Sequence, residues 1–163
     1  EECAHIMTSP LPTGLMTVIQ IFYALVCIIG LAGNSLVIYV VLRYSKMQTV
    51  TNMYILNLAM ADFLYCLINL PMYAVQYLEM RWPFGFEACY VSTAFRYIVA
   101  FGDWMSVAIV AFSRYITIAR SGLSDVLLSD LNGVIAIALV WIYAFSLIVP
   151  VLTRVWFDIL TLT

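Results

Sequence analysis

Charge is scarce in this chain of 163 residues. Charged side chains make up 10% of it, whereas a soluble domain carries about 25%. The net charge is −2, and no cluster of lysine or arginine offers a surface to the phosphates of a nucleic acid. His5 is the only histidine, so the chain cannot build a histidine-based catalytic triad or a multi-histidine metal site. With no glycine-rich phosphate loop and no Cys-x-x-Cys pair either, the sequence does not predict an enzyme.

Hydrophobic residues, in contrast, make up 65% of the chain. Four apolar runs are each long enough for a membrane-spanning helix, which takes about 20 residues. We expect these spans at about residues 15–42, 53–78, 87–119 and 131–153. Residues 1–14 form a polar leader before the first span, and residues 154–163 follow the last one. The sequence therefore predicts an all-α membrane protein.

Basic residues near the ends of the spans indicate the orientation. One side of the expected membrane carries Arg43, Lys46, Arg114 and Arg120, and the other side carries Arg81 and Arg154. Segments next to the cytoplasmic ends of spans are enriched in lysine and arginine. We therefore expect both termini of the chain outside the cell.

A carboxylate, Asp62, stands near the middle of the second span. An ionisable group at that depth costs a few kcal/mol on insertion scales, so it should face other helices and find amides, hydroxyls or a cation. The third span carries Arg96, Asp103 and Arg114 near one helical face, since their spacings are close to whole turns. This span should therefore be central in the bundle, with Asp103 near the depth of Asp62.

Two carboxylates near one poorly solvated cavity cannot both stay ionised without help. Three arrangements would resolve the conflict: one carboxyl keeps its proton, a cation lies between the two, or Arg96 turns inward and pairs with Asp103. We favour the cation, because Asn34 and nearby backbone could complete an oxygen shell around it.

Several motifs of the first half resemble one known family. Residues 57–62 read Asn-Leu-Ala-Met-Ala-Asp, Gly33 and Asn34 lie upstream, and Trp-Pro-Phe-Gly follows at 82–85. Together they resemble the rhodopsin-like (class A) G-protein-coupled receptors. Residues 32–89 are most similar to somatostatin, opioid and allatostatin-C receptors, and parts of the later chain also resemble Moody-type orphan receptors. The resemblance implies the first four helices of a seven-helix receptor bundle, with residues 154–163 starting the second extracellular loop.

The resemblance assigns a sodium ion to the first two helices. It implies that Asp62 and Asn34 face each other and help to bind sodium, and no other cofactor is expected. The family usually has a small hydroxyl residue where this chain has Asp103. The alternative is a hydrogen-bonded polar pair that only fixes the packing of the helices.

The resemblance also implies that Arg114 and Tyr115 engage the G protein. The family usually has Asp or Glu directly before this arginine, whereas this chain has Ser113. Because a hydroxyl cannot neutralise a guanidinium, we expect a weaker restraint on Arg114 in the inactive state. The alternative is that Arg114 only anchors the helix at the cytoplasmic interface, with its side chain reaching toward water.

Arg96 is expected to face the bundle about two turns beyond Cys89. The similar peptide receptors carry Asp there, so Arg96 reverses the charge. We therefore expect an anionic or carboxylate-bearing ligand, a peptide or a small molecule, with Gln76 and Tyr97 as further contacts. The alternatives are a structural salt bridge, or an Arg96 side chain that reaches the outer interface.

Other residues have structural roles in the family. The cysteine at Cys89 normally pairs with one in the second extracellular loop, but residues 154–163 contain none, so the usual partner is absent. Cys3 flanks the spans on the same side, where an oxidising compartment would permit a disulfide. The resemblance further implies hydrogen bonds between helices and packing beside the disulfide, from Asn57, Ser106, Trp141 and Trp82.

The expected function is that of a plasma-membrane receptor that transmits an extracellular ligand signal to a heterotrimeric G protein. Two alternatives remain open. One is a truncated, non-signalling receptor that binds full-length partners. The other is a four-span channel or transporter subunit with Asp62, Arg96 and Asp103 along its pathway.

Overall fold

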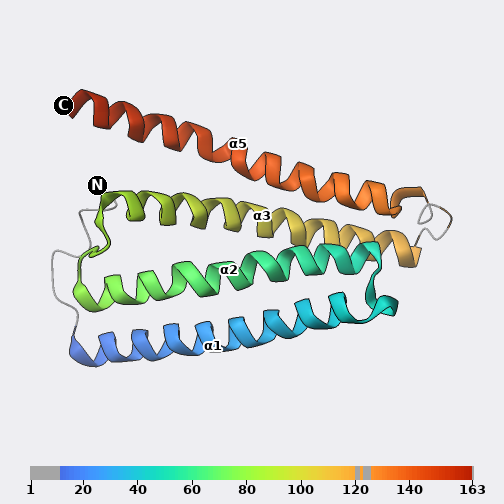
Figure 1. Cartoon of the computed structure of the whole chain (residues 1–163), viewed down its shortest axis with the longest axis horizontal. Coiled ribbons are helices and arrows are strands. Elements are labelled where there is room, and N and C mark those ends of the chain that lie inside the picture. Colours follow the sequence, from blue (N-terminus) through green and yellow to red (C-terminus); the bar gives the residue numbers. More distant parts are fainter. Residues whose placement is uncertain (1–11, 120–121, 123–125, 163) are drawn as a thin grey trace.

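The computed structural model describes residues 12–119, 122 and 126–162. Most of the expected leader, with Cys3 and His5, and also Arg120 therefore lie outside the described residues. The described chain consists of helices and connecting turns, with no strand, which confirms the all-α prediction. The elements are α1 (Thr13–Arg43), the 3₁₀ turn η1 (Ser45–Met47), α2 (Val50–Glu79), α3 (Gly85–Ala119) and α5 (Asp130–Leu162) (Figure 1).

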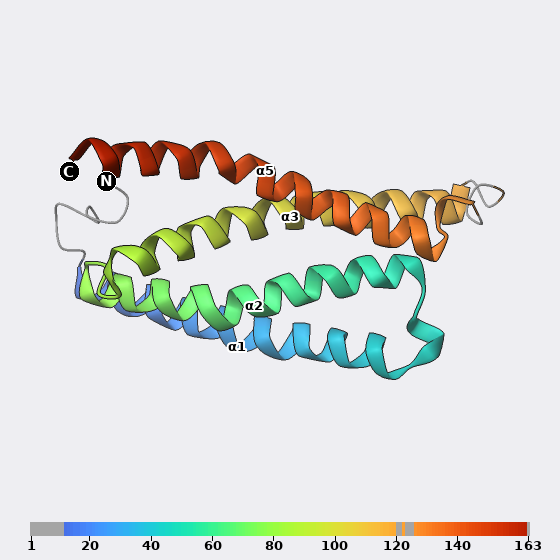
Figure 2. The same ribbon diagram turned by 45° about the horizontal axis from the view of Figure 1, so that its top comes forward.

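The helices run up and down along one common axis (Figures 1 and 2). Helix α1 packs on α2, α2 packs on α3, and α3 packs on α5. Helix α5 also touches α2. The start of α1, the turn from α2 to α3 and the end of α5 lie at one end of the bundle, which we call the turn end (Figure 1). The end of α3 and the start of α5 lie at the opposite end.

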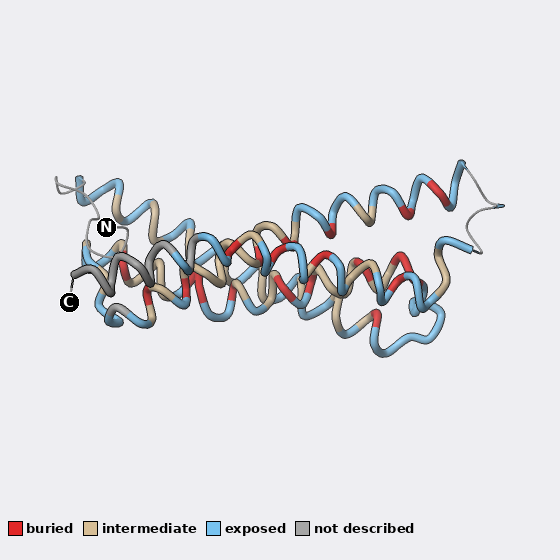
Figure 3. Tube along the Cα trace, turned by 90° about the horizontal axis from the view of Figure 1, so that it is seen from above, coloured by how far each residue is buried: buried red, intermediate tan, exposed pale blue. Residues whose placement is uncertain are grey.

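Among the described residues, α1, α2, α3 and α5 each contain a stretch long and apolar enough to cross a membrane: Thr13–Arg43, Val50–Glu79, Glu87–Ala119 and Asp130–Pro150. Their outward faces expose large apolar side chains, among them Phe22 at 65% and Ile118 at 84%. Buried residues gather where helices touch, as the colouring of Figure 3 shows. Apolar side chains on the outward faces fit a lipid environment, where the outer surface of a protein need not be polar.

The last helix is longer than the span expected from the sequence. α5 continues to Leu162, whereas the sequence predicts the end of the fourth span at Thr153 and a loop from residue 154. No glycine or proline follows Pro150 in this stretch, so no helix-breaking residue interrupts the hydrogen-bond ladder.

Pro71 lies inside α2, which stays helical through it. A proline removes one backbone donor and disturbs the carbonyls of the preceding turn. Side chains of α1 donate to carbonyls on both sides of it: Cys27 Sγ to Cys66 O at 3.3 Å and Gln20 Nε2 to Ala74 O at 3.0 Å. These two bonds hold α2 against α1 on either side of the proline.

Gly30 allows α1 and α2 to approach closely. A Cβ at this position would lie 2.5 Å from Cys66 Sγ, which is an overlap. We expect Gly30→Ala to destabilise the protein by about 1–3 kcal/mol, the usual cost of overpacking. Thermal unfolding of the protein in nanodiscs measures this change.

Gly33 on the same helix supplies a matched control, because a Cβ there meets nothing within 4 Å. Gly33→Ala should be neutral or stabilising through its helix propensity. Adding Cys66→Ala to Gly30→Ala should recover part of the loss, because the overlapping sulfur is gone. Equal stabilities for Gly30→Ala and Gly33→Ala would contradict the close approach.

Candidate functional site

Two acidic side chains meet in the middle of the bundle. Asp62 of α2 and Asp103 of α3 line one cavity of about 280 Å³, which we call the acidic cavity. Its other lining residues are Tyr65, Arg96, Val99, Ala100 and Trp104. The carboxyl groups of Asp62 and Asp103 lie within hydrogen-bonding reach of each other. The structure therefore brings together the two carboxylates that the sequence placed at one depth.

The acidic pair has an unsatisfied acceptor. Asp103 Oδ1 is buried and accepts no hydrogen bond. Among the described residues, the one ion pair joins Arg81 to Glu79 at 3.7 Å, and both side chains are exposed. Arg96 is thus not in ion-pair contact with Asp103 in this structure. Two carboxyl groups at this separation need a shared proton or a cation between them.

Asn34 is not part of this cavity's lining. Its Nδ2 donates to Gly30 O of its own helix at 2.9 Å, and it does not border the acidic cavity. Across the described part of the chain, no group of three or more His, Cys, Asp or Glu side chains converges. A cation between Asp62 and Asp103 would therefore draw further oxygen ligands from elsewhere, such as backbone carbonyls or water.

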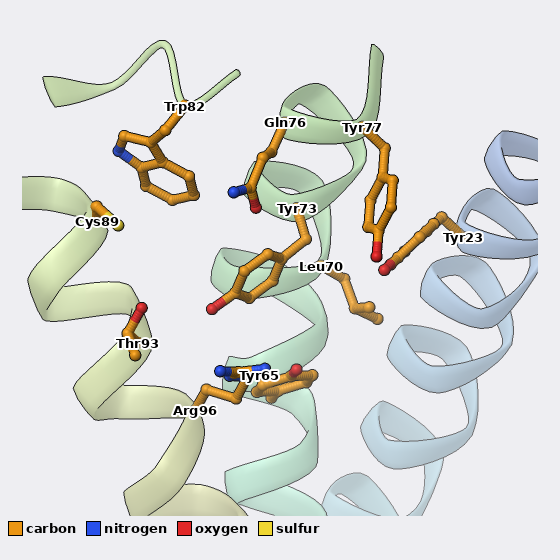
Figure 4. A pocket seen from close by; sticks show the side chains of 10 residues that line it. All are labelled: Tyr23, Tyr65, Leu70, Tyr73, Gln76, Tyr77, Trp82, Cys89, Thr93 and Arg96. Carbon is orange, nitrogen blue, oxygen red and sulfur yellow. The ribbon is translucent and has the colours of Figure 1, made fainter. Parts of the chain in front are cut away.

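A second cavity of about 410 Å³ lies toward the turn end, and we call it the tyrosine cavity. Side chains of α1, α2, α3 and the α2–α3 turn line it (Figure 4). They are Tyr23, Tyr65, Leu70, Tyr73, Gln76, Tyr77, Trp82, Cys89, Thr93 and Arg96. This set contains one cationic side chain, several hydroxyl groups and no carboxylate. Its chemistry is that of a site for an acceptor-rich or anionic group.

Arg96 lies at the deep end of the tyrosine cavity, at the opposite end from Trp82 (Figure 4). Its guanidinium carbon lies 5.6 Å from the centre of the Tyr73 ring and 4.9 Å from that of Tyr97. Both distances are within the range of cation–π attraction. Arg96 Nε and Tyr73 Oη are buried without a hydrogen-bond partner. Two polar groups at this cavity are therefore left for a ligand to satisfy.

The other expected ligand contacts differ in position. Gln76 lines the tyrosine cavity and is 5% exposed. Tyr97 does not line it, and instead its ring supports Arg96. Tyr97 is thus placed to orient the arginine and not to meet a ligand in this cavity.

A hydrogen-bonded cluster joins α2, α3 and α5. Asn57 Nδ2 donates to Ser106 Oγ at 3.0 Å, and Trp141 Nε1 donates to Asn57 Oδ1 at 2.8 Å. Trp141 also packs against Gly102, where a Cβ would lie 3.0 Å from its ring. Asn57 therefore connects three helices with both ends of its amide, next to the level of the acidic cavity.

The α2–α3 turn is fixed by Trp82. Its Nε1 donates to Gly85 O at 2.7 Å, and its ring meets Phe84 edge-on at a centroid distance of 5.3 Å. Trp82 and Cys89 both line the tyrosine cavity. Cys89 is 3% exposed, and the free cysteines in the part of the chain that the structure describes are Cys27 and Cys66.

Arg114 and Tyr115 lie at the opposite end of α3, where both are exposed. Ser113 is 1% exposed, and its Oγ donates to Val110 O of the same helix at 2.8 Å. The serine hydroxyl is therefore engaged by its own helix, and no ion pair holds Arg114 within the part of the chain described.

Sequence reasoning missed two tyrosines of α2 that line the tyrosine cavity, and also a buried amide. Tyr73 and Tyr77 share one helical face with the expected contact Gln76, at i, i+3, i+4 spacing, a signal that could have identified them. Asn69 is fully buried, and its Nδ2 donates to Ser92 O of α3 at 2.9 Å. A polar residue between Asp62 and Pro71 in an apolar run was the available sign.

Comparisons with known proteins agree with this arrangement. Residues 33–159 match the family described as 7 transmembrane receptor (rhodopsin family). The chain is 39% identical over 142 residues to somatostatin receptor type 5 of Mus musculus, covering 86% of this chain and 39% of that receptor. It is 45% identical over 103 residues to somatostatin receptor type 2 of Sus scrofa, covering 63% of this chain and 28% of the receptor.

A third similar protein is the neuropeptides B/W receptor type 1 of Homo sapiens, which is 39% identical over 118 residues. That match covers 72% of this chain and 36% of that receptor. The chain thus spans well under half the length of the curated relatives it matches. Since the family match covers residues 33–159, most of the chain, this multi-pass membrane protein belongs to the rhodopsin family of seven-transmembrane receptors.

Proposed function

We propose that the protein is a G-protein-coupled receptor that transmits an extracellular ligand signal to a heterotrimeric G protein. The observation that carries this proposal is the layout of α3. One end of this helix borders the tyrosine cavity, and the other end presents Arg114 and Tyr115 on the surface. A ligand that shifts α3 would change the surface at the far end, which is how such receptors couple two sites. The family match favours this function over a four-span channel or transporter subunit.

The ligand that suits the tyrosine cavity is anionic or carries a carboxylate. The lining offers Arg96 and tyrosine hydroxyls but no acid, and Arg96 Nε and Tyr73 Oη lack partners. Gln76 is a further contact from α2. One curated relative is named as a receptor for neuropeptides, so a peptide carboxylate is one candidate and a small organic acid is another.

For the acidic cavity we propose a sodium ion between Asp62 and Asp103. The two carboxyl groups lie within hydrogen-bonding reach, and Asp103 Oδ1 has no partner. Asn34 would need to release Gly30 O to contribute its amide. We propose no other cofactor.

We also propose that the turn end faces the outside of the cell, with the chain in the plasma membrane. Arg43 and Lys46 lie on the connection at the opposite end, together with the exposed Arg114 of α3. The end of a membrane protein that is richer in lysine and arginine usually faces the cytoplasm. Both chain termini are then extracellular, and so are Cys89 and Trp82.

Glycosylation mapping tests this topology. An acceptor site inserted between Lys46 and Thr49 should remain unmodified, because it would face the cytoplasm. An acceptor site in the α2–α3 turn should be reached by the glycosylation machinery. Modification of the first site and not of the second would invert the proposed orientation.

Nucleotide exchange on purified G proteins tests the receptor function itself. Because Ser113 leaves Arg114 without an acidic partner, the full-length protein in nanodiscs should stimulate exchange on at least one G-protein class without ligand. Arg114→Ala should remove this stimulation, whereas Arg81→Ala at the turn end should not. The 163-residue chain alone should be inactive, because four helices cannot complete a seven-helix cytoplasmic cavity. Absence of exchange from the full-length protein on every class would contradict the proposal.

A further inference from the structure

Two tyrosines from different helices form the side of the tyrosine cavity that faces α1. Tyr23 of α1 and Tyr77 of α2 both line this cavity, and their ring centres lie 5.6 Å apart. Their hydroxyl groups are within hydrogen-bonding reach of each other, and Figure 4 shows the two oxygens side by side. The cavity therefore has a second polar site, which we call the tyrosine pair, away from Arg96.

Two hydrogen bonds fix the position of α1 on either side of this pair. One turn before Tyr23, Gln20 Nε2 donates to Ala74 O of α2 at 3.0 Å. One turn after Tyr23, Cys27 Sγ donates to Cys66 O of α2 at 3.3 Å. Because α1 is held against α2 at both places, the Tyr23 hydroxyl is presented to the cavity at a defined position.

The tyrosine pair suits a neutral amide. When one of two hydroxyl groups donates to the other, one O–H proton and several lone pairs remain free. An amide matches this set, because its carbonyl accepts the free proton and its N–H donates to a hydroxyl oxygen. A second carboxylate would fit poorly, since Arg96 is the one cationic side chain among the described residues that line the cavity, and a charge without a partner is costly to bury.

The tyrosine pair and the arginine lie at different depths. The guanidinium carbon of Arg96 lies 5.6 Å from the centre of the Tyr73 ring, and Tyr77 follows Tyr73 by about one helical turn. In Figure 4 the Tyr73 hydroxyl points to the side of α3, whereas the Tyr77 hydroxyl points toward Tyr23 of α1. The two polar sites are therefore separated by one to two turns, roughly 6–10 Å.

We propose that the ligand of this protein carries two recognition groups, a carboxylate that binds at Arg96 and Tyr73 and a neutral amide that binds at the tyrosine pair. This inference rests on the proposed function, since it takes the anion at Arg96 as given. It names the class of ligand, which is an acid with an amide roughly 6–10 Å from its carboxylate. A peptide with a free carboxyl terminus has this chemistry, and so does a small amide-bearing acid.

Two small acids of equal length test the amide site. Adipamate carries a carboxylate and a terminal amide, whereas heptanoate carries the carboxylate alone. Their apparent affinities are obtained from the thermal stability of the full-length protein in nanodiscs, at constant sodium concentration and ionic strength. Tyr23→Phe and Tyr77→Phe should each weaken adipamate binding about two- to tenfold, the equivalent of one hydrogen bond, and leave heptanoate binding unchanged. Tyr39→Phe is the matched control, because Tyr39 is 58% exposed on α1 outside this cavity, and it should change neither.

Arg96→Gln separates the amide site from the anion site of the proposed function. This variant should weaken the binding of both acids. If both acids need Arg96 but neither responds to Tyr23→Phe or Tyr77→Phe, the amide site is overturned and the anion site stands. Equal losses for adipamate and heptanoate in the tyrosine variants would mean altered packing and would also overturn the amide site. Binding of neither acid to the parent protein, or binding that ignores Arg96, would overturn both sites.

A peptide probe distinguishes the two sources of this chemistry. N-acetyldiglycine has a free carboxyl terminus and an amide further along the chain, and its C-terminal amide lacks the charge. The acid should bind in a manner that depends on Tyr23, and the C-terminal amide should bind about tenfold more weakly or worse, as expected for the loss of a charged hydrogen bond. Tighter binding of N-acetyldiglycine than of adipamate would support a peptide ligand, and the reverse order would support a small acid. Equal binding of the peptide acid and its amide would overturn the carboxylate part of the proposal.

Discussion

Sodium is expected to stabilise the full-length protein against heat, and Asp62→Asn and Asp103→Asn are each expected to remove most of that stabilisation. The two carboxyl groups lie within hydrogen-bonding reach and share one cavity, so either substitution takes away half of the charge that would hold the ion. At a sodium concentration ten times the dissociation constant, binding adds about 1.4 kcal/mol. In a protein of this size or larger, this corresponds to a rise of a few degrees in Tm.

The measurement compares Tm in sodium and in N-methyl-D-glucamine at equal ionic strength. Asp130→Asn is the matched control, because Asp130 is exposed at the start of α5, and it should keep the full response. A full sodium response in Asp103→Asn would show that Asp103 is not a ligand. In that case the alternative in which Asp103 pairs with Arg96 would account better for its position.

The position of the acidic pair could be predicted from the sequence because it depends on two simple geometric rules. Antiparallel spans of similar length bring their midpoints to one depth, and the rise of 1.5 Å per residue converts position in the sequence into depth. Asp62 and Asp103 therefore meet as expected. The Asn57 contacts follow from the same geometry, since Ser106 lies one turn after Asp103.

The orientation of individual side chains was not predictable in this way. Whether Arg96 pairs with an acid or lies over tyrosine rings depends on its rotamer and on Tyr73 of another helix. Asn34 has a backbone acceptor in its own helix, Gly30 O, that competes with any role in the cavity. The tyrosine cavity itself arises from three helices and one turn, so a reading of each span alone does not reveal it.

The end of the last helix shows a different limit. Residues 154–162 are mixed in polarity, which suggested a loop, but they lack glycine and proline. Hydropathy decides where a helix leaves the membrane, whereas helix propensity decides where it ends. α5 therefore continues past Thr153 to Leu162.

Ser113→Asp is expected to lower the ligand-independent G-protein activation of the full-length protein about fivefold or more, an ordinary size for a change in a two-state equilibrium. Ser113 now uses its hydroxyl on Val110 O, and Arg114 has no ion-pair partner within the described residues. A carboxylate directly before Arg114 would give the guanidinium a charged partner that the active arrangement must break. The active state would therefore become less populated without ligand.

Ser113→Asn is the matched control, because it has nearly the same size as Asp without the charge. Ser113 is 1% exposed, so both variants carry the same burden of fitting a larger side chain. Nucleotide exchange is compared at equal surface expression. If the charge acts as proposed, Asp lowers basal exchange well below Asn. Equal exchange from Ser113→Asp and Ser113→Asn would mean that size and not charge controls Arg114, and the serine would then not explain basal activity.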